Sequence, residues 1–382
     1  MIPNDGEGQF QIPPFKHLNK KSDEEGFEGY DSSNWFNEED FKKTVIAPMH
    51  AEDPTDLYFD SYSHYYIHEE MIKDHVRTSS YEKAMMKNSE VLKDKIVLDI
   101  GCGTGILSIF AARAGAKHVY GIDNAEIAEY AKHIVKKNGF ADKITIIKGK
   151  VEEIELPVEQ VDVIISEWMG YFLLYESMLD TVLFARDKWL VKDKGIIMPD
   201  KFNMFIAGFE DKFGFKTSKQ VFWKEVYGID MEEIGNLIYI EPTVEAIEMK
   251  QIKTDVCTFY SLDLNTCKKE DAVFANKYCI TMQQEGKIDG LITWFDCEFR
   301  HNLKVPLRFT TGPFTHVTHW KQTLFYIDGE YDLEKGDKMF GSLAIRKNKK
   351  HPRELDIKIS FNCQEDNGQE IGERYIQYFQ MT

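Results

Sequence analysis

Two glutamates at either end of one short segment are the residues of this chain best suited to chemistry. Glu167 and Glu176 lie within Ser166-Glu-Trp-Met-Gly-Tyr-Phe-Leu-Leu-Tyr-Glu176, directly after residues 161–165, which have the apolar pattern of a buried strand. Carboxylates beside aromatic and aliphatic side chains are costly unless a cation neutralises them. The loop after a strand in an α/β fold is also where ligands bind. The segment therefore predicts a site for a positively charged ligand.

A glycine-rich turn is the second candidate site. Residues 96–105 read Ile-Val-Leu-Asp-Ile-Gly-Cys-Gly-Thr-Gly, and an apolar, helix-forming run follows. This order predicts a buried strand, a tight turn that lets backbone approach a ligand, and a helix whose N-terminus faces the same crevice. The dinucleotide fingerprint needs a third glycine three residues after the second, and Ile106 stands there. The turn therefore favours S-adenosylmethionine, whose sulfonium and ammonium groups suit the acidic Asp99.

Two further predicted strands bring polar groups to the same crevice. Residues 117–123 end in Asp123, eighteen residues after Gly105, a spacing at which a carboxylate accepts hydrogen bonds from ribose hydroxyls. The strand predicted at 144–149 is followed by Val151 and Glu152, where an adenine could be gripped. Three consecutive βα units thus point to one nucleotide-type crevice.

Composition narrows the class of protein. The 382 residues exceed one ordinary core, and 43% apolar content is enough for two domains. The net charge of −17 argues against direct nucleic-acid binding and suits basic polypeptide partners, although from charge alone acidity that supports solubility is the stronger explanation. No apolar run approaches the roughly twenty residues that span a bilayer, so no membrane association is expected.

Cysteine usage predicts the compartment. The six cysteines show neither a C-x-x-C pair nor zinc-ligand spacing, and the N-terminus has no signal-like apolar core. We therefore expect a protein of the cytoplasm and nucleus that holds no metal. The basic cluster at 346–353 could be a nuclear signal, but a polar hairpin turn between strands is the better explanation.

The pattern of elements predicts three parts. Residues 1–50 are acidic and rich in glycine and serine, which is typical of a flexible extension. Residues 51–199 alternate helical periods with short Val/Ile strands, which predicts an α/β domain with the doubly wound parallel sheet of a Rossmann-like fold. After Pro199, residues 200–382 contain runs that alternate like antiparallel strands of a sandwich or barrel, at 291–299, 322–327 and 354–361.

An aromatic segment follows the boundary, at about 209–236. It shows no strand alternation and contains Phe213, Phe215, Phe222, Trp223 and Tyr227. Because aromatic residues are enriched at interface cores, the segment could be an arm that docks on a second subunit. Ordinary core beneath the antiparallel domain explains it equally well.

Four separated blocks of sequence form a recognisable set. They are residues 58–62 with 67–78, the glycine turn at 99–105, the double-glutamate loop at 166–176, and Thr318-His-Trp-Lys-Gln322. From about Asp56 to the C-terminus the chain resembles the protein arginine methyltransferases of the asymmetric-dimethylating type. The resemblance implies an enzyme with an S-adenosylmethionine-binding Rossmann-like domain, then an antiparallel β-barrel domain with a helical dimerisation arm. Its products would be S-adenosylhomocysteine and monomethyl and asymmetric dimethylarginine.

The resemblance also assigns the catalytic roles. Glu167 and Glu176 would hold the target guanidinium by charge-assisted hydrogen bonds and localise its positive charge, which frees electron density on the attacking nitrogen. His319 would pair with Asp74, holding the two domains together and helping to accept the departing proton.

The cofactor and product residues follow from the same resemblance. Arg77 would bind the methionyl carboxylate, Asp99 and Gly101 would lie near the amino-acid moiety, and Asp123 would bind the ribose. The other implied cofactor contacts are Phe59, Tyr62, His68, Met71, Val151, Glu152 and Thr181. Substrate binding and product control would fall to Met71, Met178 and Trp320. Arginine-rich proteins, such as Arg-Gly-rich RNA-binding proteins and histone tails, would be the substrates of a homodimer.

Two positions depart from the family pattern, and three alternatives stay open. Asp123 replaces a glutamate, and Tyr66 stands where a small residue is usual, so the fit of the cofactor would differ. A small-molecule methyltransferase would not be expected to carry Thr318-His-Trp320, and a non-catalytic scaffold should have lost one of its key charged residues. A nicotinamide dehydrogenase is disfavoured by Ile106 and would bind nucleotide in place of S-adenosylmethionine.

Overall fold

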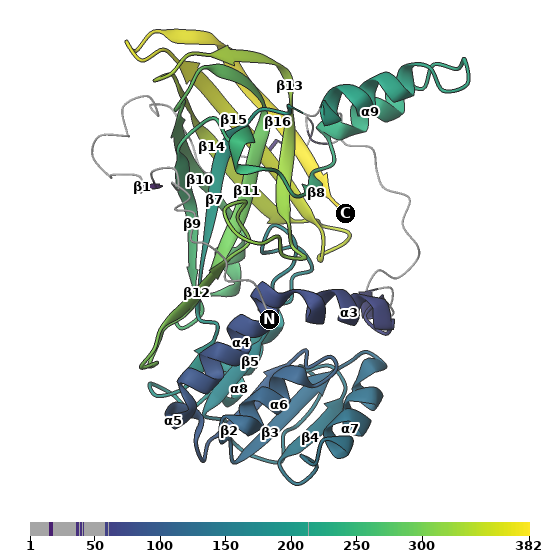
Figure 1. The fold of residues 1–382 in the computed structure, drawn as a ribbon, viewed down its shortest axis with the longest axis vertical. Helices are drawn as coiled ribbons and strands as arrows, with labels where there is room; N and C mark the ends of the chain where they lie inside the picture. Colours follow the sequence, from purple (N-terminus) through teal and green to yellow (C-terminus); the bar gives the residue numbers. More distant parts are fainter. Residues whose placement is uncertain are drawn as a thin grey trace, which may run out of the picture.

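A computed structural model describes residues 58–59, 61–212 and 214–382, the backbone at 15–17, and residues 36, 37, 39 and 41 (Figure 1). Most of the extension predicted at 1–50, and Phe213 of the aromatic segment, lie outside the described residues. At 215, 217, 219 and 220 only the backbone is described.

The first domain contains a five-stranded parallel sheet in the order β4-β3-β2-β5-β6. Its strands are β2 Ile96–Ile100, β3 His118–Asp123, β4 Ile144–Lys148, β5 Val163–Ser166 and β6 Ile196–Met198. Its helices are α3 Tyr65–Lys73, α4 His75–Lys87, α5 Ser89–Leu92, α6 Ile106–Arg113, α7 Ile127–Lys137 and α8 Leu179–Trp189. Side chains alternate across β2: Val97 faces a core shared with α4, α6 and α7, whereas Leu98 and Ile100 face a core shared with α8. The prediction of a Rossmann-like sheet is confirmed.

The second domain consists of two mainly antiparallel sheets (Figure 1). One runs β1-β9-β7-β11-β13-β8, with β12 on β11, and the other runs β10-β14-β15-β16. Their bounds are β1 Phe15–His17, β7 Lys201–Phe209, β8 Thr243–Glu245, β9 Val256–Asp263, β10 Phe274–Thr281, β11 Gly286–Phe299, β12 Leu307–Thr310, β13 Gln322–Leu333, β14 Lys338–Lys347, β15 Leu355–Gln364 and β16 Glu370–Met381. Phe325 and Phe379, one from each sheet, meet at 5.0 Å between ring centroids, so the sheets enclose a common apolar interior. The expectation of an antiparallel barrel-like domain is confirmed.

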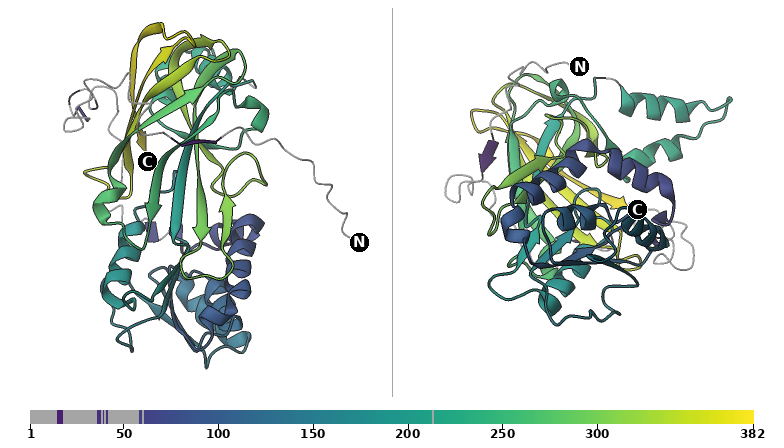
Figure 2. Two further views of the ribbon diagram at one scale, coloured as in Figure 1. Left: turned by 90° about the vertical axis from the view of Figure 1, so that its left-hand side faces the viewer. Right: turned by 60° about the horizontal axis from the view of Figure 1, so that its bottom comes forward.

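The chain passes from the first domain to the second at Pro199, between the end of β6 and the start of β7. The first domain packs against the lower end of the barrel (Figure 2). The ring of Tyr81 on α4 lies 5.1 Å from that of Phe299 on β11. Asn88 donates to the carbonyl oxygen of Val305 and accepts from its N–H, both at 2.9 Å. The second domain is therefore positioned to contribute residues to a site on the first.

A helical arm leaves the second domain after β7 (Figures 1 and 2). Its helices are α9 Phe215–Lys224 and α10 Glu232–Gly235, and the shorter 3₁₀ segments of the domain are Asn236–Tyr239, Met249–Gln251 and Lys269–Ala272. Phe222 is 60% exposed and Ile229 is 58% exposed, so these apolar side chains do not form core beneath the barrel. None of the helices in the described part of the chain has both the length and the apolar character needed to cross a bilayer.

Candidate active site

The loop between β5 and α8 carries both glutamates in an unusual backbone conformation. Phe172, Leu173, Glu176 and Ser177 have positive φ angles of 51°, 63°, 76° and 57°. Each such non-glycine residue costs on the order of 1 kcal/mol or more, so surrounding contacts must hold the loop. Its interior is apolar and consists of Trp168, Met169, Phe172, Leu173 and Leu174, all buried.

Glu167 forms a buried ion pair with Arg77 of α4. Arg77 donates from Nε at 2.9 Å and from Nη2 at 2.8 Å, both to Oε2 of Glu167. The two side chains are only 7% and 6% exposed. Arg77 was expected beside a cofactor carboxylate, and the structure places its guanidinium on Glu167, a contact that neither spacing nor the family resemblance predicted. The loop therefore already binds one guanidinium group.

Glu176 lies beside two tyrosine hydroxyls. The Tyr62 hydroxyl is 2.9 Å and 3.2 Å from its two carboxylate oxygens, and Tyr58 also acts on the carboxylate. Burial raises the pKa of Glu176 to about 7; the tyrosines and Arg353 oppose the rise, whereas the negative charge of Glu167 adds to it. Tyr62 was expected at the cofactor, and Tyr58 was not among the predicted site residues although it lies in the same sequence block.

The glycine turn is shaped by Asp123 at the end of β3. Asp123 accepts from the N–H of Gly103 at 2.8 Å and from that of Ala125 at 2.9 Å. A Cβ on Gly103 would lie 3.3 Å from the ring of His68, and a Cβ on Gly101 would lie 2.6 Å from Cε of Met178. Both predicted residues, His68 and Met178, therefore pack directly against the turn, which only glycine fits.

Asp99, in β2 just before the turn, is fully buried. Ser108 of α6 donates to its Oδ2 at 2.6 Å, and Oδ1 has no hydrogen-bond partner among the described residues. Burial raises the pKa of Asp99 to about 7, against the Ser108 hydrogen bond and with help from Asp123. A buried carboxyl oxygen without a donor fits a ligand that brings a cationic N–H group.

The remaining predicted cofactor residues lie around the same end of the sheet. Thr181 donates to Glu152 at 2.7 Å, and Val151 is buried beside them after β4. The carbonyl oxygen of Met71 accepts from Nη1 of Arg77 at 3.4 Å. The ring of Phe59 lies 5.1 Å from that of Tyr58.

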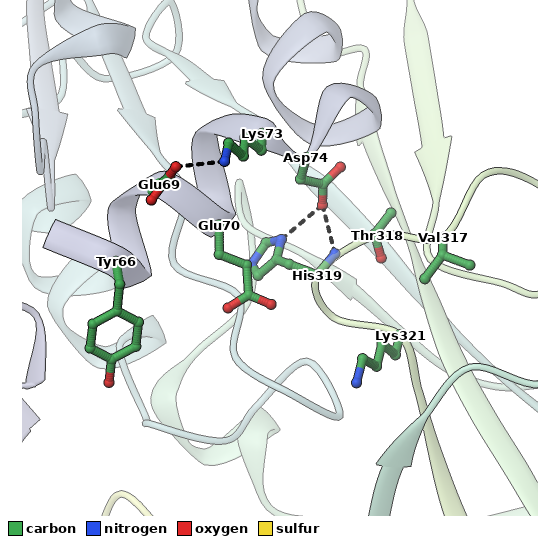
Figure 3. Close-up of a pocket in the computed structure, with 9 residues that line it drawn as sticks. All are labelled: Tyr66, Glu69, Glu70, Lys73, Asp74, Val317, Thr318, His319 and Lys321. Carbon is green, nitrogen blue, oxygen red and sulfur yellow. Dashed lines mark hydrogen bonds and ion pairs between the residues drawn. The ribbon is translucent and has the colours of Figure 1, made fainter.

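His319 of the second domain contacts Asp74 of the first domain, and this pair joins the two domains (Figure 3). The backbone N–H and the ring Nδ1 of His319 contact Oδ2 of Asp74 at 2.9 Å and 2.8 Å, while Oδ1 caps α4 through the N–H of Arg77 at 3.0 Å. Burial works to raise the pKa of Asp74, but the bonds from His319 and from Arg77 outweigh it, so the pKa is lowered. A carboxylate that holds Nδ1–H leaves Nε2 of His319 as a proton acceptor.

An open pocket of about 490 Å³ lies next to this pair (Figure 3). It is lined by Tyr66, Glu69, Glu70, Lys73, Asp74, Val317, Thr318, His319 and Lys321. Tyr66, one of the two departures from the family pattern, is 59% exposed on α3. Three acidic residues and two lysines therefore line the surface next to His319.

Trp320 has a different setting from the one expected. It was predicted to contact the substrate, but its side chain is 3% exposed and its Nε1–H donates to the carbonyl oxygen of Met169 at 2.7 Å. Its ring packs against those of Phe295 and Phe309. Trp320 therefore supports the glutamate loop from the second domain.

Two protein families match this chain. "Arginine methyltransferase oligomerization subdomain" matches residues 200–366, and "Ribosomal protein L11 methyltransferase (PrmA)" matches residues 78–213. The first match covers the arm and the second domain up to the strand before β16, and the second match covers the parallel sheet.

Full-length relatives and solved structures are also similar. Protein arginine N-methyltransferase 1 of Chlamydomonas reinhardtii is 52% identical over 323 residues, covering 85% of this chain and 93% of the relative. The Schizosaccharomyces pombe protein of the same name is 50% identical over 334 residues, covering 87% and 96%. The Trypanosoma brucei PRMT1 enzyme-prozyme heterotetrameric complex with AdoHcy has a TM-score of 0.80 at 43% identity, and the match covers 85% of this chain and 100% of that one. Arabidopsis thaliana protein arginine methyltransferase 10 has a TM-score of 0.78 at 30% identity, with the same coverage.

Proposed function

Since this chain belongs to the protein arginine N-methyltransferase family, we propose that Glu167 and Glu176 hold and polarise the arginine that receives the methyl group. The enzyme transfers methyl groups from S-adenosylmethionine to arginine nitrogens of proteins. One observation carries the proposed role: Glu167 already accepts two hydrogen bonds from a guanidinium, that of Arg77. Both bonds go to Oε2, so Oε1 of Glu167 and the carboxylate of Glu176 are the groups that we propose receive the substrate guanidinium.

The two carboxylates overcome the low reactivity of arginine. An arginine side chain is protonated at neutral pH, and its nitrogens are poor nucleophiles while the charge is shared among them. Charge-assisted bonds to Glu167 and Glu176 draw the charge toward the bonded nitrogens and orient the remaining one. We propose that Nε2 of His319, whose Nδ1 contacts Asp74, accepts the proton that the nitrogen loses.

The residues around the glycine turn fit S-adenosylmethionine. Asp99 has an unpartnered buried oxygen for its ammonium group, and Gly101 and Gly103 allow close approach of the backbone. Arg77 would hold the carboxylate and Asp123 the ribose, with Glu152 and Val151 at the adenine. When bound, S-adenosylmethionine supplies a methyl group activated by the sulfonium.

We propose asymmetric dimethylarginine as the final product. Met71 and Met178 are the residues that we propose control it. Cε of Met178 packs against Gly101, 2.6 Å from the position that a Cβ would take there. The bulk of these side chains would decide which nitrogen can accept a second methyl group.

Substrates, assembly and compartment are proposed at the level of class. The net charge of −17, and Glu70 beside the pocket, support arginine-rich substrates such as Arg-Gly-rich RNA-binding proteins and histone tails. The exposed apolar arm supports a homodimer, and the match to an oligomerisation subdomain supports assembly in general. All six cysteines are free and buried, which supports the cytoplasm and nucleus.

The test is transfer of labelled methyl from S-adenosylmethionine to an Arg-Gly-rich peptide, followed by acid hydrolysis to identify the product. A Lys-Gly peptide of equal charge is the control. Label in asymmetric dimethylarginine, with none on the lysine peptide, is the expected result. Symmetric or only monomethyl product would overturn the product assignment, and label on lysine would overturn the acceptor.

A further inference from the structure

The backbone of Glu176 is held by a residue of the second domain. The N–H of Glu176 donates to the carbonyl oxygen of Arg353 at 2.8 Å. In return, Nη1 of Arg353 donates to the carbonyl oxygen of Glu176 at 2.7 Å. Both polar groups of the Glu176 backbone are thus satisfied by one arginine, 177 positions away in sequence.

The same arginine reaches the side chain of Glu176 through Tyr58. The guanidinium carbon of Arg353 lies 3.7 Å from the centroid of the Tyr58 ring, a cation–π contact. The Tyr58 side chain is one of the groups that oppose the rise in the pKa of Glu176, so it acts on the Glu176 carboxylate. Arg353 therefore holds the backbone of Glu176 directly and packs on a tyrosine that acts on its carboxylate.

The hairpin that carries Arg353 is itself anchored on the glutamate loop and on α8. It connects β14 and β15, and the hydroxyl of Ser177 donates to the carbonyl oxygen of Pro352 at 2.6 Å. Lys347 donates to Asp180 at 2.6 Å. Within the hairpin, Asn348 accepts from the N–H groups of Lys350 at 2.9 Å and His351 at 3.1 Å, which gives the turn a defined shape.

The loop needs this support because Glu176 and Ser177 both have positive φ. Such a conformation persists only when its surroundings over-determine it. We propose that Arg353 is a positioning residue for Glu176, so that the second domain completes the active site by holding one of the two glutamates in its working conformation. This inference rests on the role proposed above for Glu176.

The proposal also predicts a pH effect. The groups facing Glu176 are Tyr58 and Tyr62 from the segment before α3, Glu167, Tyr171 and Tyr175 from its own loop, and Arg353 from the hairpin. Arg353 is the cation among them, and its charge favours the ionised form that binds guanidinium. Loss of that charge should move the acidic limb of the activity profile to higher pH.

The experiment compares Arg353→Gln and Arg353→Lys with the wild-type enzyme on an Arg-Gly-rich peptide. Arg186→Gln is the matched control, because Arg186 also donates across the domain boundary, to the carbonyl oxygens of Leu264 at 2.8 Å and Cys267 at 2.7 Å, away from Glu176. We expect kcat of Arg353→Gln to fall at least about tenfold, since a small displacement of a reacting group has that order of effect. The acidic limb of kcat/KM should move up in the glutamine variant and stay near the wild-type position in the lysine variant.

The outcomes separate this inference from the proposed function. Melting temperature and S-adenosylmethionine affinity, measured for every variant, identify loss of folding, and the lysine variant carries the test if the glutamine variant unfolds. Wild-type kcat and pH profile in a folded Arg353→Gln enzyme, with Glu176→Gln inactive, would overturn the role of Arg353 alone. Full activity of Glu176→Gln would overturn the role of Glu176 itself.

Discussion

Arg77 binds Glu167 in the structure, and it is also the residue that we propose binds the carboxylate of the cofactor. Its guanidinium makes four contacts, two to Glu167 and two from Nη1 to Met71 and Thr78. Since a guanidinium has five N–H donors, Arg77 keeps capacity for a ligand carboxylate while it stays near Glu167. With the proposed roles, the cofactor end and the substrate end of the site would share the side chain of Arg77.

Substitution of Glu167 by glutamine should separate chemistry from binding. The amide still accepts a hydrogen bond from Arg77, so the fold should persist, but the charge that polarises the substrate is lost. We expect kcat to fall by about 10²–10³-fold or more, as for other electrostatic groups of active sites. Calorimetry should find S-adenosylmethionine affinity nearly unchanged. The exposed Glu159→Gln is the control, and full activity of Glu167→Gln would remove Glu167 from the mechanism.

Glu176 should set the acidic limit of activity. Its pKa is raised to about 7 by burial, and only the ionised form can hold a guanidinium. Activity should therefore fall as pH drops below about 7, by about tenfold per unit well below the pKa. Tyr62→Phe removes a bond that favours the ionised form, so it should shift this limb of kcat/KM to higher pH. Tyr227→Phe, on the arm, should not, and a limb that Tyr62→Phe leaves in place would contradict the assignment.

At the scale of elements, the glycine turn works because side chains from other elements fill the space that a Cβ would need. Met178 occupies that space at Gly101, and the ring of His68 occupies it at Gly103. The strand, the turn and helix α6 are local in sequence, but their fit depends on the loop before α8 and on α3.

Gly101→Ala should therefore weaken cofactor binding more than Gly139→Ala, a substitution at another glycine with positive φ. Its φ is +70° and the new Cβ would meet Met178 at 2.6 Å. Gly139 has a similar φ of +77° with nothing within 4 Å, so Gly139→Ala isolates the backbone strain, on the order of 1 kcal/mol. Titration calorimetry should find lower S-adenosylmethionine affinity for Gly101→Ala only. Equal affinity in the two variants would show that the contact with Met178 is unimportant.

At the scale of the whole molecule, the arm exposes apolar side chains that the rest of the described chain does not cover. Val221, Phe222, Tyr227, Ile229 and Ile234 are all exposed on it or beside it. Apolar side chains gathered on a projecting element are typical of an interface that a second chain covers.

If the arm forms the proposed homodimer, the double variant Phe222→Ser with Ile229→Ser should shift the enzyme from dimer to monomer. Burial of two large apolar side chains is worth about 1.5–3 kcal/mol each, enough to weaken a dimer by orders of magnitude. Sedimentation equilibrium across a concentration series measures this change. Val273→Ser, at an exposed position away from the arm, is the control, and an unchanged dimer in the double variant would place the interface elsewhere.

Local patterns in the chain were enough to predict the parallel sheet, the glycine turn, the antiparallel strands and the importance of the double-glutamate segment. Strand and turn preferences depend on neighbouring residues, so the runs at 291–299 and 322–327 lie in β11 and β13, and the run at 354–361 lies in β15 from Leu355 onward. Roles for Asp74, His319 and the cofactor residues came from resemblance to a family and not from spacing.

Only the tertiary structure decided which partners these residues have. The pairs Arg77 with Glu167 and Arg353 with Glu176 are 90 and 177 positions apart in sequence. Trp320, which was expected at the substrate surface, is buried in the structure. Phe222 lies on an exposed arm and not in a core. The physical reason is that burial and pairing depend on how two domains pack, and a basic run such as 346–353 has the same charge whether it faces solvent or holds a catalytic loop.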